Sequence, residues 1–466
     1  MVVVGGGIAG LAAATAVRRA RPDVEVVVLE AGPRAGGKLR QAEVGGVTVD
    51  VGAESMLNRR PEAVWLARSA GLGDRLVHPA TISANIWTRG GLHRMPRSLL
   101  GVPVDNKDLA DSGILSPQGL ARASLDAVLP ATHLDGHDVS VGWLIEERFG
   151  REVLDRLVEP LLGGVYAGHA REISALAAAP QVVALLGEER SMMKAAAAAV
   201  SRSSAADTPV FAGLAGGLWQ LADTLAAGLD VRTGTTARDL VPAGDGGWHV
   251  VVGPAWAPEL VRADAVVVAT PAAPGAKLLA GAAPDAALEL AAIEYASMAV
   301  VTMAFPAARF PEVVGSGFLV PPVDGRQVKA ATYSFQKWEW VRDSAEDLLV
   351  MRTSIGRHRE EQQLQVSDEE LVERSVIDLR AAIGLAARPV DWHVQRWGGG
   401  LPQYAVGHLD RVRRIRSAVS AVPGLAVCGA AYDGLGLPAC IASAEAAADQ
   451  VLDQLPPAGH PSTAGL

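Results

Sequence analysis

Residues 2–10 read Val-Val-Val-Gly-Gly-Gly-Ile-Ala-Gly, and this stretch decides the fold of the chain. A short β-branched run leads into G-x-G-x-x-G, and residues 11–21 then have the composition of a helix. In this pattern Gly5 permits a tight turn, Gly7 lets the backbone approach a pyrophosphate, and Gly10 lets the helix pack close to the strand. The N–H groups that open the helix carry about half a positive charge, which suits a diphosphate. The stretch therefore predicts a nucleotide-binding β-α-β unit.

A carboxylate stands where a nucleotide-binding unit needs one. Residues 24–29 form a second β-branched run, and Glu30 follows it, twenty residues beyond Gly10. There the carboxylate can accept hydrogen bonds from ribose hydroxyls, and it repels the 2′-phosphate of NADP. The alternative is a glycine turn that holds no ligand, but strand, turn, helix, strand and acid all occur in the expected order. A dinucleotide site is the better interpretation.

The polar loop after the second strand favours FAD over NAD. Residues 30–38 read Glu-Ala-Gly-Pro-Arg-Ala-Gly-Gly-Lys, so the doubled glycine can supply N–H groups, and Lys38 a cation, to a second phosphate. No second dinucleotide fingerprint follows a strand, because Gly-Leu-Ala-Gly-Gly at 213–217 is better explained as the cap of a helix at 218–229. Without a nicotinamide site, a flavin must pass its electrons elsewhere, and dioxygen or a quinone is the simplest acceptor.

Composition excludes several other classes of protein. The chain has 466 residues and a net charge of −9, with no basic stripe, so a nucleic-acid partner is not expected. Its two cysteines, Cys428 and Cys440, form no CxxC motif and suit a reducing compartment. No basic leader precedes the first strand and no apolar run spans a bilayer, so we expect a cytoplasmic protein without a membrane span. His133 and His137 are four residues apart, but Gly136 breaks a helix between them, and no metal site is expected.

Strand and helix patterns divide the chain into alternating segments. Residues 39–51 suggest a hairpin, residues 96–204 are mostly helical around a polar connection at 103–116, and strand-like runs dominate 291–395 apart from a helix at 368–383. The chain closes with a strand at 425–428, a glycine turn and a helix at 441–452. We therefore expect an α/β fold with a Rossmann-like FAD-binding domain, a mixed-sheet substrate domain and an inserted helical domain. The expected boundaries are 1–75, 206–280 and 397–455 for the FAD-binding domain, 76–95 and 281–396 for the substrate domain, 96–205 for the helical domain, and 456–466 for a mobile tail.

Several short motifs resemble those of the porphyrinogen oxidases within the flavin amine oxidase superfamily. Residues 30–38 are similar to its E-A-x-x-R-x-G-G-K/R element, and residues 52–55, Gly-Ala-Glu-Ser, look like its next flavin contact. Residues 163–168 resemble G-G-x-Y-A-G, and residues 401–408 resemble x-P-Q-Y-x-x-G-H. Residues 429–441 match the closing G-x-G-L-P-D-C-I, with Ala439 replacing the acid. The resemblance covers almost the whole chain in the same order.

The resemblance implies which residues hold the flavin. The start of the closing helix can point N–H groups at the electron-rich side of the flavin ring. Trp397 and Ala237 fall at flavin contacts, although Trp397 is equally consistent with a core aromatic. Gly164 and Tyr166 would shape a macrocycle pocket, although Tyr166 could equally be a tyrosine of the protein core. No catalytic side chain is predicted. The predicted cofactor-binding residues are Gly5, Gly6, Gly7, Ile8, Ala9, Gly10, Glu30, Ala31, Lys38, Gly52, Ala53, Glu54, Ser55, Ala237, Trp397, Gly436, Leu437 and Pro438.

The substrate in this family carries either two or four propionates. Protoporphyrinogen oxidases of eukaryotic type have an arginine twelve residues before the proline of a G-x-L-H-x-x-P segment; here Pro96 closes that segment and Ala84 occupies the matching position. Loss of that cation suits an open, wet pocket and a substrate with more carboxylates. The resemblance therefore implies FAD-dependent oxidation of coproporphyrinogen III in haem biosynthesis, in three two-electron steps, with dioxygen as acceptor and hydrogen peroxide released.

Other functions remain open at this point. Oxidation of protoporphyrinogen IX is the near alternative, and a flavin amine oxidase is a distant one. A flavin-binding partner protein without turnover is a further alternative, because a fold does not by itself establish a function. The sequence does not determine the oligomeric state or any contact with a ferrochelatase.

Overall fold

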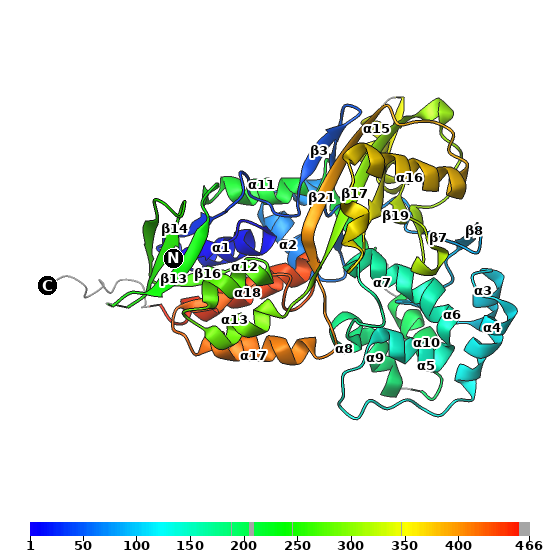
Figure 1. Ribbon diagram of the computed structural model, residues 1–466, viewed down its shortest axis with the longest axis horizontal. Coiled ribbons are helices and arrows are strands. Elements are labelled where there is room, and N and C mark those ends of the chain that lie inside the picture. Colours follow the sequence, from blue (N-terminus) through cyan, green and yellow to red (C-terminus); the bar gives the residue numbers. More distant parts are fainter. Residues whose placement is uncertain (188, 205–208, 245, 346, 456–466) are drawn as a thin grey trace.

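The computed structural model describes residues 1–187, 189–204, 209–244, 246–345 and 347–455, and the tail at 456–466 that was expected to be mobile lies outside this part. The molecule is elongated, with a parallel α/β region at one end and a large mixed sheet and a group of helices at the other (Figure 1). These three regions are the α/β architecture that the sequence predicts. In the described part of the chain no helix is both long and apolar enough to cross a membrane.

A five-stranded parallel sheet forms the centre of the α/β region. Its strand order is β12-β2-β1-β16-β22, so the first strand of the chain lies in the middle. β1 pairs with β2 and β16 in the registers Val2↔Val27 and Val2↔Val266. Both faces of the sheet are covered, which explains why every strand except the edge strand β12 is a continuous apolar run. The strands are β1 (Val2–Val4), β2 (Val27–Leu29), β12 (Asp230–Arg232), β16 (Val266–Val268) and β22 (Leu425–Val427).

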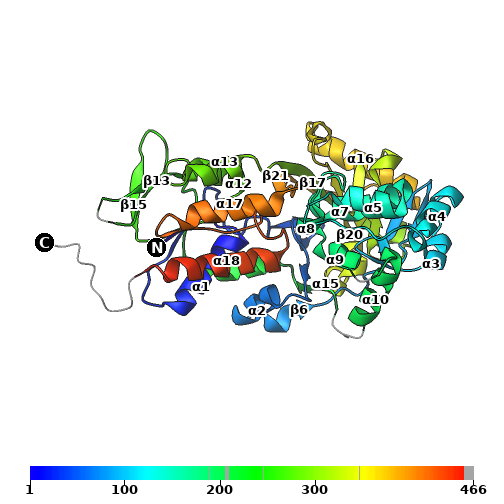
Figure 2. The same cartoon turned by 90° about the horizontal axis from the view of Figure 1, so that it is seen from below.

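Alanine-rich helices pack against this sheet. α1 (Ile8–Ala20) and α18 (Leu437–Leu452) lie side by side (Figure 2) and share one core with the inward side chains of the strands. Their small side chains allow the two backbones to come close. α12 (Ala272–Leu279), α13 (Pro284–Ala291) and α17 (His408–Ser420) form the core on the other face.

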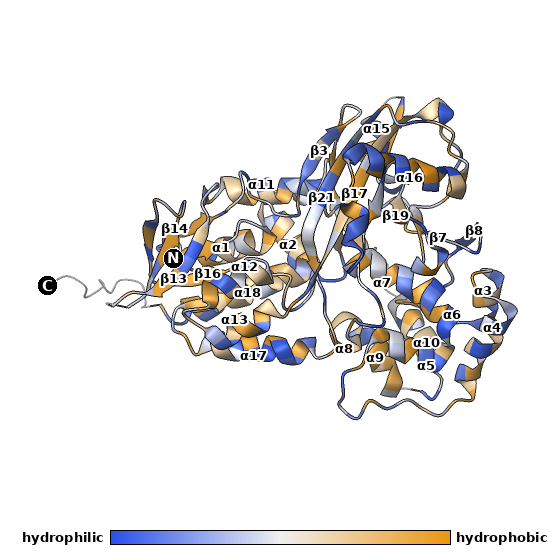
Figure 3. Ribbon diagram, viewed as in Figure 1, coloured by the Kyte–Doolittle hydropathy of each residue, from blue (hydrophilic) through white to orange (hydrophobic). Residues whose placement is uncertain are grey.

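A seven-stranded mixed sheet forms the second region, as predicted. Its order is β21-β17-β20-β19-β18-β7-β8, antiparallel except between β18 and β7. α16 (Asp368–Ile383) has the bounds that the sequence predicts, covers one face of this sheet, and carries both hydrophilic and hydrophobic residues in Figure 3. The strands are β7 (Asn85–Thr88), β8 (Gly91–Arg94), β17 (Tyr295–Pro306), β18 (Gly317–Leu319), β19 (Val328–Thr332), β20 (Leu348–Ile355) and β21 (Asp391–Pro402).

Two irregularities interrupt the strand pairing, one beside the edge strand β21 and one in the middle of the sheet. The register between β17 and β21 shifts between Ala296 and Met298, and the register between β19 and β20 shifts between Val328 and Ala330. Such bulges re-aim side chains and are common beside active sites. Both shifts bear on the candidate site described below.

The third region is mostly helical, as expected for residues 96–204, but the polar connection expected at 103–116 contains a helix. α3 (Asn106–Asp111) forms there because the Asp105 carboxylate accepts hydrogen bonds from the N–H groups of Lys107 and Asp108 and so caps it. The other helices are α4 (Pro117–Ser124), α5 (Val141–Phe149), α6 (Arg151–Val153), α7 (Glu159–Tyr166), α8 (Ala175–Ala178), α9 (Pro180–Ala184) and α10 (Met192–Ser204).

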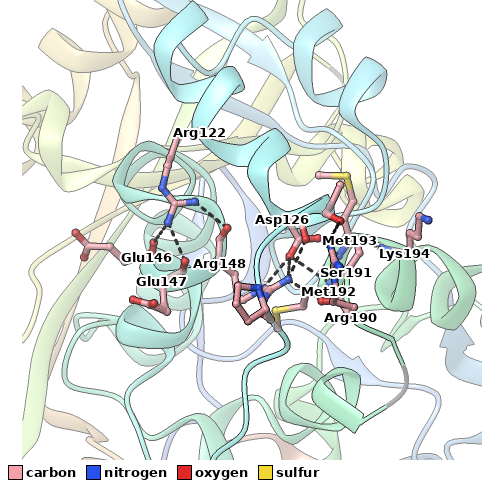
Figure 4. Close-up of polar contacts among 12 residues, drawn as sticks. Arg122, Asp126, Glu146, Glu147, Arg148, Arg190, Ser191, Met192, Met193 and Lys194 are labelled. Carbon is pink, nitrogen blue, oxygen red and sulfur yellow. Dashed lines mark hydrogen bonds and ion pairs between the residues drawn. The ribbon is translucent and has the colours of Figure 1, made fainter.

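A buried ion pair holds these helices together. Asp126 and Arg148 are 1% and 2% exposed, and the Arg148 guanidinium donates to the Asp126 carboxylate (Figure 4). The same carboxylate accepts hydrogen bonds from the Ser191 hydroxyl at 2.7 Å and from the N–H of Met193 at 3.0 Å, so it also caps α10. A buried pair of this kind is stable only because its remaining lone pairs are satisfied.

Smaller elements join the three regions. The predicted hairpin consists of β3 (Gln41–Val44) and β4 (Val47–Asp50), and a three-stranded antiparallel sheet consists of β13 (Ala237–Pro242), β14 (Trp248–Val252) and β15 (Glu259–Ala263). The remaining elements are β5 (Met56–Leu57), α2 (Pro61–Ser69), β6 (Leu76–Val77), β9 (Ser98–Leu99), β10 (Val102–Pro103), β11 (Phe211–Leu214), α11 (Trp219–Ala227), α14 (Ser334–Lys337) and α15 (Glu339–Asp343).

Candidate active site

The first turn of α1 has the geometry that a diphosphate site requires. Gly5 has φ +110°, and its N–H donates to the Leu29 carbonyl at 2.8 Å, so the chain turns sharply away from β1. A Cβ on Gly10 would overlap with the Gly5 carbonyl oxygen, so only glycine lets the helix come this close. A Cβ on Gly7 would have no protein atom within 4 Å, and no side chain caps the helix there. The turn, which Gly6, Ile8 and Ala9 complete, is therefore open at the helix N-terminus.

Glu30 lies directly beside this turn, at the end of β2. One carboxylate oxygen accepts a hydrogen bond from the N–H of Gly6 and the other from the N–H of Gly32, both at 2.7 Å. These contacts fix the carboxylate next to the place where a nucleotide ribose would lie. A carboxylate has about four lone-pair sites, so further hydrogen bonds to ribose hydroxyls are compatible with this arrangement.

The doubled-glycine loop folds back over the same turn. The N–H of Gly36 donates to the Gly6 carbonyl at 2.8 Å, and Gly36 forms a bridge with Gly7. Gly36 and Gly37 both have positive φ, which glycine tolerates. Lys38 and Ala31 lie on the exposed side of the loop. Although part of the Lys38 side chain is exposed, the protein packed around its ammonium group desolvates it and lowers its pKa.

Residues 52–55 and Trp397 meet at Lys38. The N–H of Ala53 donates to the Lys38 carbonyl at 3.2 Å, and the indole N–H of Trp397 donates to the Val51 carbonyl at 3.3 Å. A Cβ on Gly52 would overlap with the Lys38 carbonyl oxygen and lie 3.1 Å from the Trp397 ring. Three segments that are far apart in the sequence thus converge beside the open turn.

The side chain of Glu54 is bound within the protein. Its buried carboxylate lies 2.6 Å from the Lys337 ammonium and 3.1 Å from the Arg352 guanidinium. Desolvation opposes the charged form, but Arg352 and Lys337 together outweigh it and lower the pKa of Glu54. Arg352 also donates to the Gly52 carbonyl at 2.9 Å, and Lys337 lies 3.4 Å from the Ser55 hydroxyl. The Glu54 carboxylate therefore holds the segment in place, which leaves its backbone as the surface available to a ligand.

The closing motif reaches the same region, with one correction. α18 begins at Leu437 rather than at the predicted 441, because Pro438 occupies its first turn, where a helix needs no N–H donor. Gly436 is its N-cap, and Cys440 in its second turn interacts electrostatically with Lys38. The predicted contact Ala237 begins β13, close to Glu30, since the N–H of Thr235 donates to the Glu30 carbonyl at 2.8 Å.

The two residues predicted to face a macrocycle have different environments. Tyr166 is a core side chain: it is 8% exposed, and burial raises its pKa to about 12. Its ring packs edge-on against Tyr404 at 5.6 Å, and Tyr404 stacks on His408 at 4.1 Å. Gly164 is exposed, and a Cβ there would lie 3.5 Å from Leu319 of β18. Gly164 can therefore face a ligand directly, whereas Tyr166 supports the turn from behind.

Two motifs distant in sequence also hold each other in place. The Gln403 amide donates to the Tyr166 carbonyl at 2.8 Å, and a Cβ on Gly168 would overlap with the Gln403 side chain. In the described ranges no group of three or more His, Cys, Asp or Glu residues could hold a metal. Three cations were missed by the sequence interpretation, namely Lys329, Lys337 and Arg352. The available signal was a lone charge inside an apolar strand run, which Lys329 and Arg352 both show.

Comparison with known proteins agrees with this geometry. Residues 8–452 match the family of flavin containing amine oxidoreductases, and the chain belongs to that family. It is therefore an oxidoreductase of a family whose members contain a flavin. Its likeness to the porphyrinogen oxidases, expected from the motifs, is confirmed by the relatives described next.

Named relatives are similar along the whole chain. The chain is 37% identical over 459 residues to the coproporphyrinogen III oxidase of Mycobacterium bovis, which covers 97% of both proteins. It is 30% identical over 481 residues to the coproporphyrinogen III oxidase of Bacillus subtilis, with 98% of both covered. A crystal structure from an Exiguobacterium species, provisionally named a protoporphyrinogen oxidase, superposes with a TM-score of 0.86 at 32% identity and covers 97% of this chain and 98% of its own.

Proposed function

We propose that this protein oxidises coproporphyrinogen III to coproporphyrin III with bound FAD. Each of three two-electron steps returns its electrons to dioxygen and releases hydrogen peroxide. The observation that carries the proposal is the convergence of the Lys38 loop, residues 52–55 and Trp397 beside an open helix turn. Full-length similarity to coproporphyrinogen III oxidases of two genera supports the choice of substrate.

The proposed cofactor contacts divide by function. The turn from Gly5 to Gly10 would receive the diphosphate, because its N–H groups open α1 and no side chain blocks Gly7. Glu30 and Ala31 would hold the adenosine ribose, and Lys38 would place a cation near the second phosphate. Residues 52–55 and Trp397 would flank the ring system, with Ala237, Gly436, Leu437 and Pro438 completing the site. A flavin held by these residues would supply the redox chemistry, as the acceptor of a hydride from a meso carbon of the porphyrinogen.

The chain's own residues position the substrate rather than perform acid–base catalysis in this proposal. Aromatisation of the macrocycle drives the reaction, so little general acid–base assistance is required. Gly164 is exposed and lies beside Leu319, so both could border a macrocycle, and Tyr166 and Tyr404 keep the turn that carries Gly164 in place. The start of α18 presents N–H groups that would stabilise a reduced, negatively charged ring.

Oxidation of protoporphyrinogen IX is a second candidate, favoured by the name given to the Exiguobacterium structure. Ala84 supports the first candidate, because it supplies no charge to pair with a propionate at the position where protoporphyrinogen oxidases of eukaryotic type have an arginine. The Ala84 carbonyl accepts from the N–H of Met95 at 3.4 Å, so the position is a backbone contact between two strand ends.

The test is to offer both porphyrinogens to the purified, yellow protein and to follow porphyrin fluorescence. Faster formation of coproporphyrin, with one hydrogen peroxide per two electrons, supports the proposal. Faster formation of protoporphyrin selects the second candidate. Hydrogen peroxide formed from a simple amine would point to a flavin amine oxidase, and a protein that binds FAD but oxidises none of these would be a binding partner without turnover.

A further inference from the structure

Lys329 is a buried cation without an acidic partner. The residue is 2% exposed, although lysine is rarely buried unless it is paired. Its ammonium donates to the Gly163 carbonyl at 3.4 Å and lies 3.8 Å from the Met298 sulfur. Across the described residues it makes no ion pair with a carboxylate. An unpaired charge in such a position costs free energy, so its presence calls for a functional reason.

A bulge in β19 directs this side chain. The register shift between Val328 and Ala330 makes Lys329 the extra residue of the strand. Val328 is fully buried in the core beneath α16, and the Lys329 side chain leaves the strand on the opposite face of the sheet. The bulge therefore turns a lysine toward the face that α16 does not cover.

That face is the one turned toward the proposed flavin site. Met298 pairs directly with Trp397, so their side chains lie on the same face, and Trp397 contacts Gly52. Several side chains of this face are only partly buried, so the rest of the protein does not cover the face completely. They are Met298, Leu319, Ala330, Ser354 and Trp397.

Lys329 thus lies between two parts of the proposed site. On one side are the paired residues Met298 and Trp397. On the other side is the last turn of α7: the Lys329 amine contacts its Gly163 carbonyl, and its exposed Gly164 lies next to Leu319. The surface around the amine is mostly apolar, with Ser354 as a polar exception. A flat apolar ring that carries a negatively charged substituent is complementary to such a surface.

The electrostatics of the position support a ligand that brings a negative charge. Burial, and then the nearby Arg357 guanidinium, lower the pKa of Lys329 to about 7. Among the described residues, the hydrogen-bond partners of the amine are the Gly163 carbonyl from α7 and the Met298 thioether from β17, and neither carries a charge. Arg357, which is 3% exposed, is itself a cation, so it adds positive charge near the amine and no counter-charge. A carboxylate beside Lys329 would return the amine to its charged form.

We propose that the Lys329 amine receives one carboxylate of the tetrapyrrole and thereby selects coproporphyrinogen over protoporphyrinogen. The inference rests on the proposed function and names a specificity residue within it. Coproporphyrinogen carries four propionates, whereas protoporphyrinogen carries two, with vinyl groups in place of the others. A vinyl group next to Lys329 would leave the buried amine unpaired, whereas a propionate at the same position would form an ion pair with it. Because the contact is made by substrate and product alike, it acts on binding rather than on the chemical step.

The experiment measures binding of the product porphyrins, so it does not depend on turnover. Wild type, Lys329→Met and Lys329→Arg are titrated with coproporphyrin III and protoporphyrin IX, and Kd is obtained from fluorescence. A charge-assisted contact of about 1.5–3 kcal/mol corresponds to a loss of roughly 10- to 150-fold in coproporphyrin affinity for the methionine variant. Protoporphyrin affinity is expected to change by less than about threefold, and the arginine variant is expected to retain much of the coproporphyrin affinity.

Proton uptake gives a signature that a purely structural role would not produce. Because the pKa of Lys329 is lowered to about 7, part of the amine is neutral at pH 8, so pairing with a carboxylate should take up a fraction of a proton per ligand. Calorimetry in two buffers of different ionisation enthalpy measures this number. Wild type should take up protons on binding coproporphyrin III, and Lys329→Arg should take up none, because arginine stays charged.

These outcomes distinguish a failure of the proposed role of Lys329 from a failure of the proposed oxidase function. Equal coproporphyrin affinity in wild type and Lys329→Met, or no proton uptake by wild type, overturns the inference. A fall in kcat with unchanged Kd overturns it as well and would assign the amine to proton transfer. If wild type neither binds coproporphyrin nor oxidises coproporphyrinogen, the proposed function itself fails. Should the methionine variant not fold, the arginine variant and the wild-type proton count still decide.

Discussion

The sharpest test of the nucleotide site compares alanine at two glycines of the same turn, Gly7 and Gly10. A Cβ on Gly7 would meet no protein atom within 4 Å, and its φ of −73° is allowed for alanine. Its methyl group would nevertheless occupy the space in which a diphosphate must approach the helix N-terminus. Gly7→Ala should therefore leave the fold intact and weaken flavin binding.

The expected size follows from the contacts that would be lost. Gly7 is the N-cap of α1, where alanine is less favourable than glycine, so a decrease of up to ~1 kcal/mol in the free energy of unfolding is expected. Displacing the diphosphate from one or two charge-assisted N–H contacts should cost about 1.5–3 kcal/mol each, which is roughly 10- to 150-fold in Kd for one contact.

Gly10→Ala is the matched control. Its Cβ would lie far inside the 3.0 Å that real Cβ atoms keep from other atoms, and the obstacle is the Gly5 carbonyl, which is backbone and cannot rotate away. The helix would have to move away from β1, and overpacking of this kind costs about 1–3 kcal/mol or more. This variant should lose both stability and flavin.

The assay measures urea unfolding of each apo-protein together with FAD affinity by quenching of flavin fluorescence. We expect Gly7→Ala to weaken FAD binding with little loss of stability, and Gly10→Ala to lose both stability and FAD binding. If Gly7→Ala binds FAD as tightly as wild type, the diphosphate does not lie against this turn, and the assignment of the site would be wrong.

Three further predictions concern buried charges. Arg148→Met should lower the free energy of unfolding by ~3–5 kcal/mol, because it leaves the Asp126 carboxylate buried without its cation. Arg151→Ala should change it by less than about 0.5 kcal/mol, because the Arg151 guanidinium that pairs with Asp155 is itself 76% exposed. Urea unfolding compares the two variants, and equal effects would contradict this account. Glu54→Gln should reduce the FAD content of the purified protein, measured by absorbance, because it breaks the ion pairs that tie residues 52–55 to the partly buried cations Lys337 and Arg352. Normal FAD content at normal stability would show that these ion pairs do not position the segment. The Asp50 carboxylate accepts hydrogen bonds from the N–H groups of Leu218 and Trp219, and burial raises its pKa to about 7. The folded protein therefore binds the carboxyl proton more tightly than the unfolded chain does. The contribution of Asp50 to the free energy of unfolding should fall as the pH rises from about 4 to 7. Asp50→Asn should remove that slope in urea unfolding across this range, and a wild-type-minus-variant difference that is the same at every pH would refute it.

The candidate site combines residues whose roles differ in how directly they can contact a ligand. The glycine turn and the Lys38 loop present backbone to the open side. Glu54, Tyr166 and Gln403 lie behind these surfaces and are bound to other parts of the protein. Substitutions of the second group should therefore act on flavin content or substrate affinity through the position of the first.

Much of this protein could be predicted locally. The turn from Gly5 to Gly10 depends on steric limits that act within a few residues, and the sequence therefore specifies it without reference to the rest of the chain. The same holds for α16, whose Ser367 cap and apolar periodicity lie inside a segment of 17 residues, and its bounds were predicted without error. The start of α18 was missed by four residues, because a proline read as part of a loop is equally suited to the first turn of a helix.

What only the tertiary structure decided is which distant residues share one environment. Pairing of β1 with β16 and of β16 with β22 joins strands separated by hundreds of residues, and no local period encodes that order. The sequence likewise shows Glu54, Arg352 and Lys329 as isolated charges. The fold pairs the first two and leaves the third buried without a counter-charge, because the environment of a charge depends on everything packed around it and not on its neighbours in the chain.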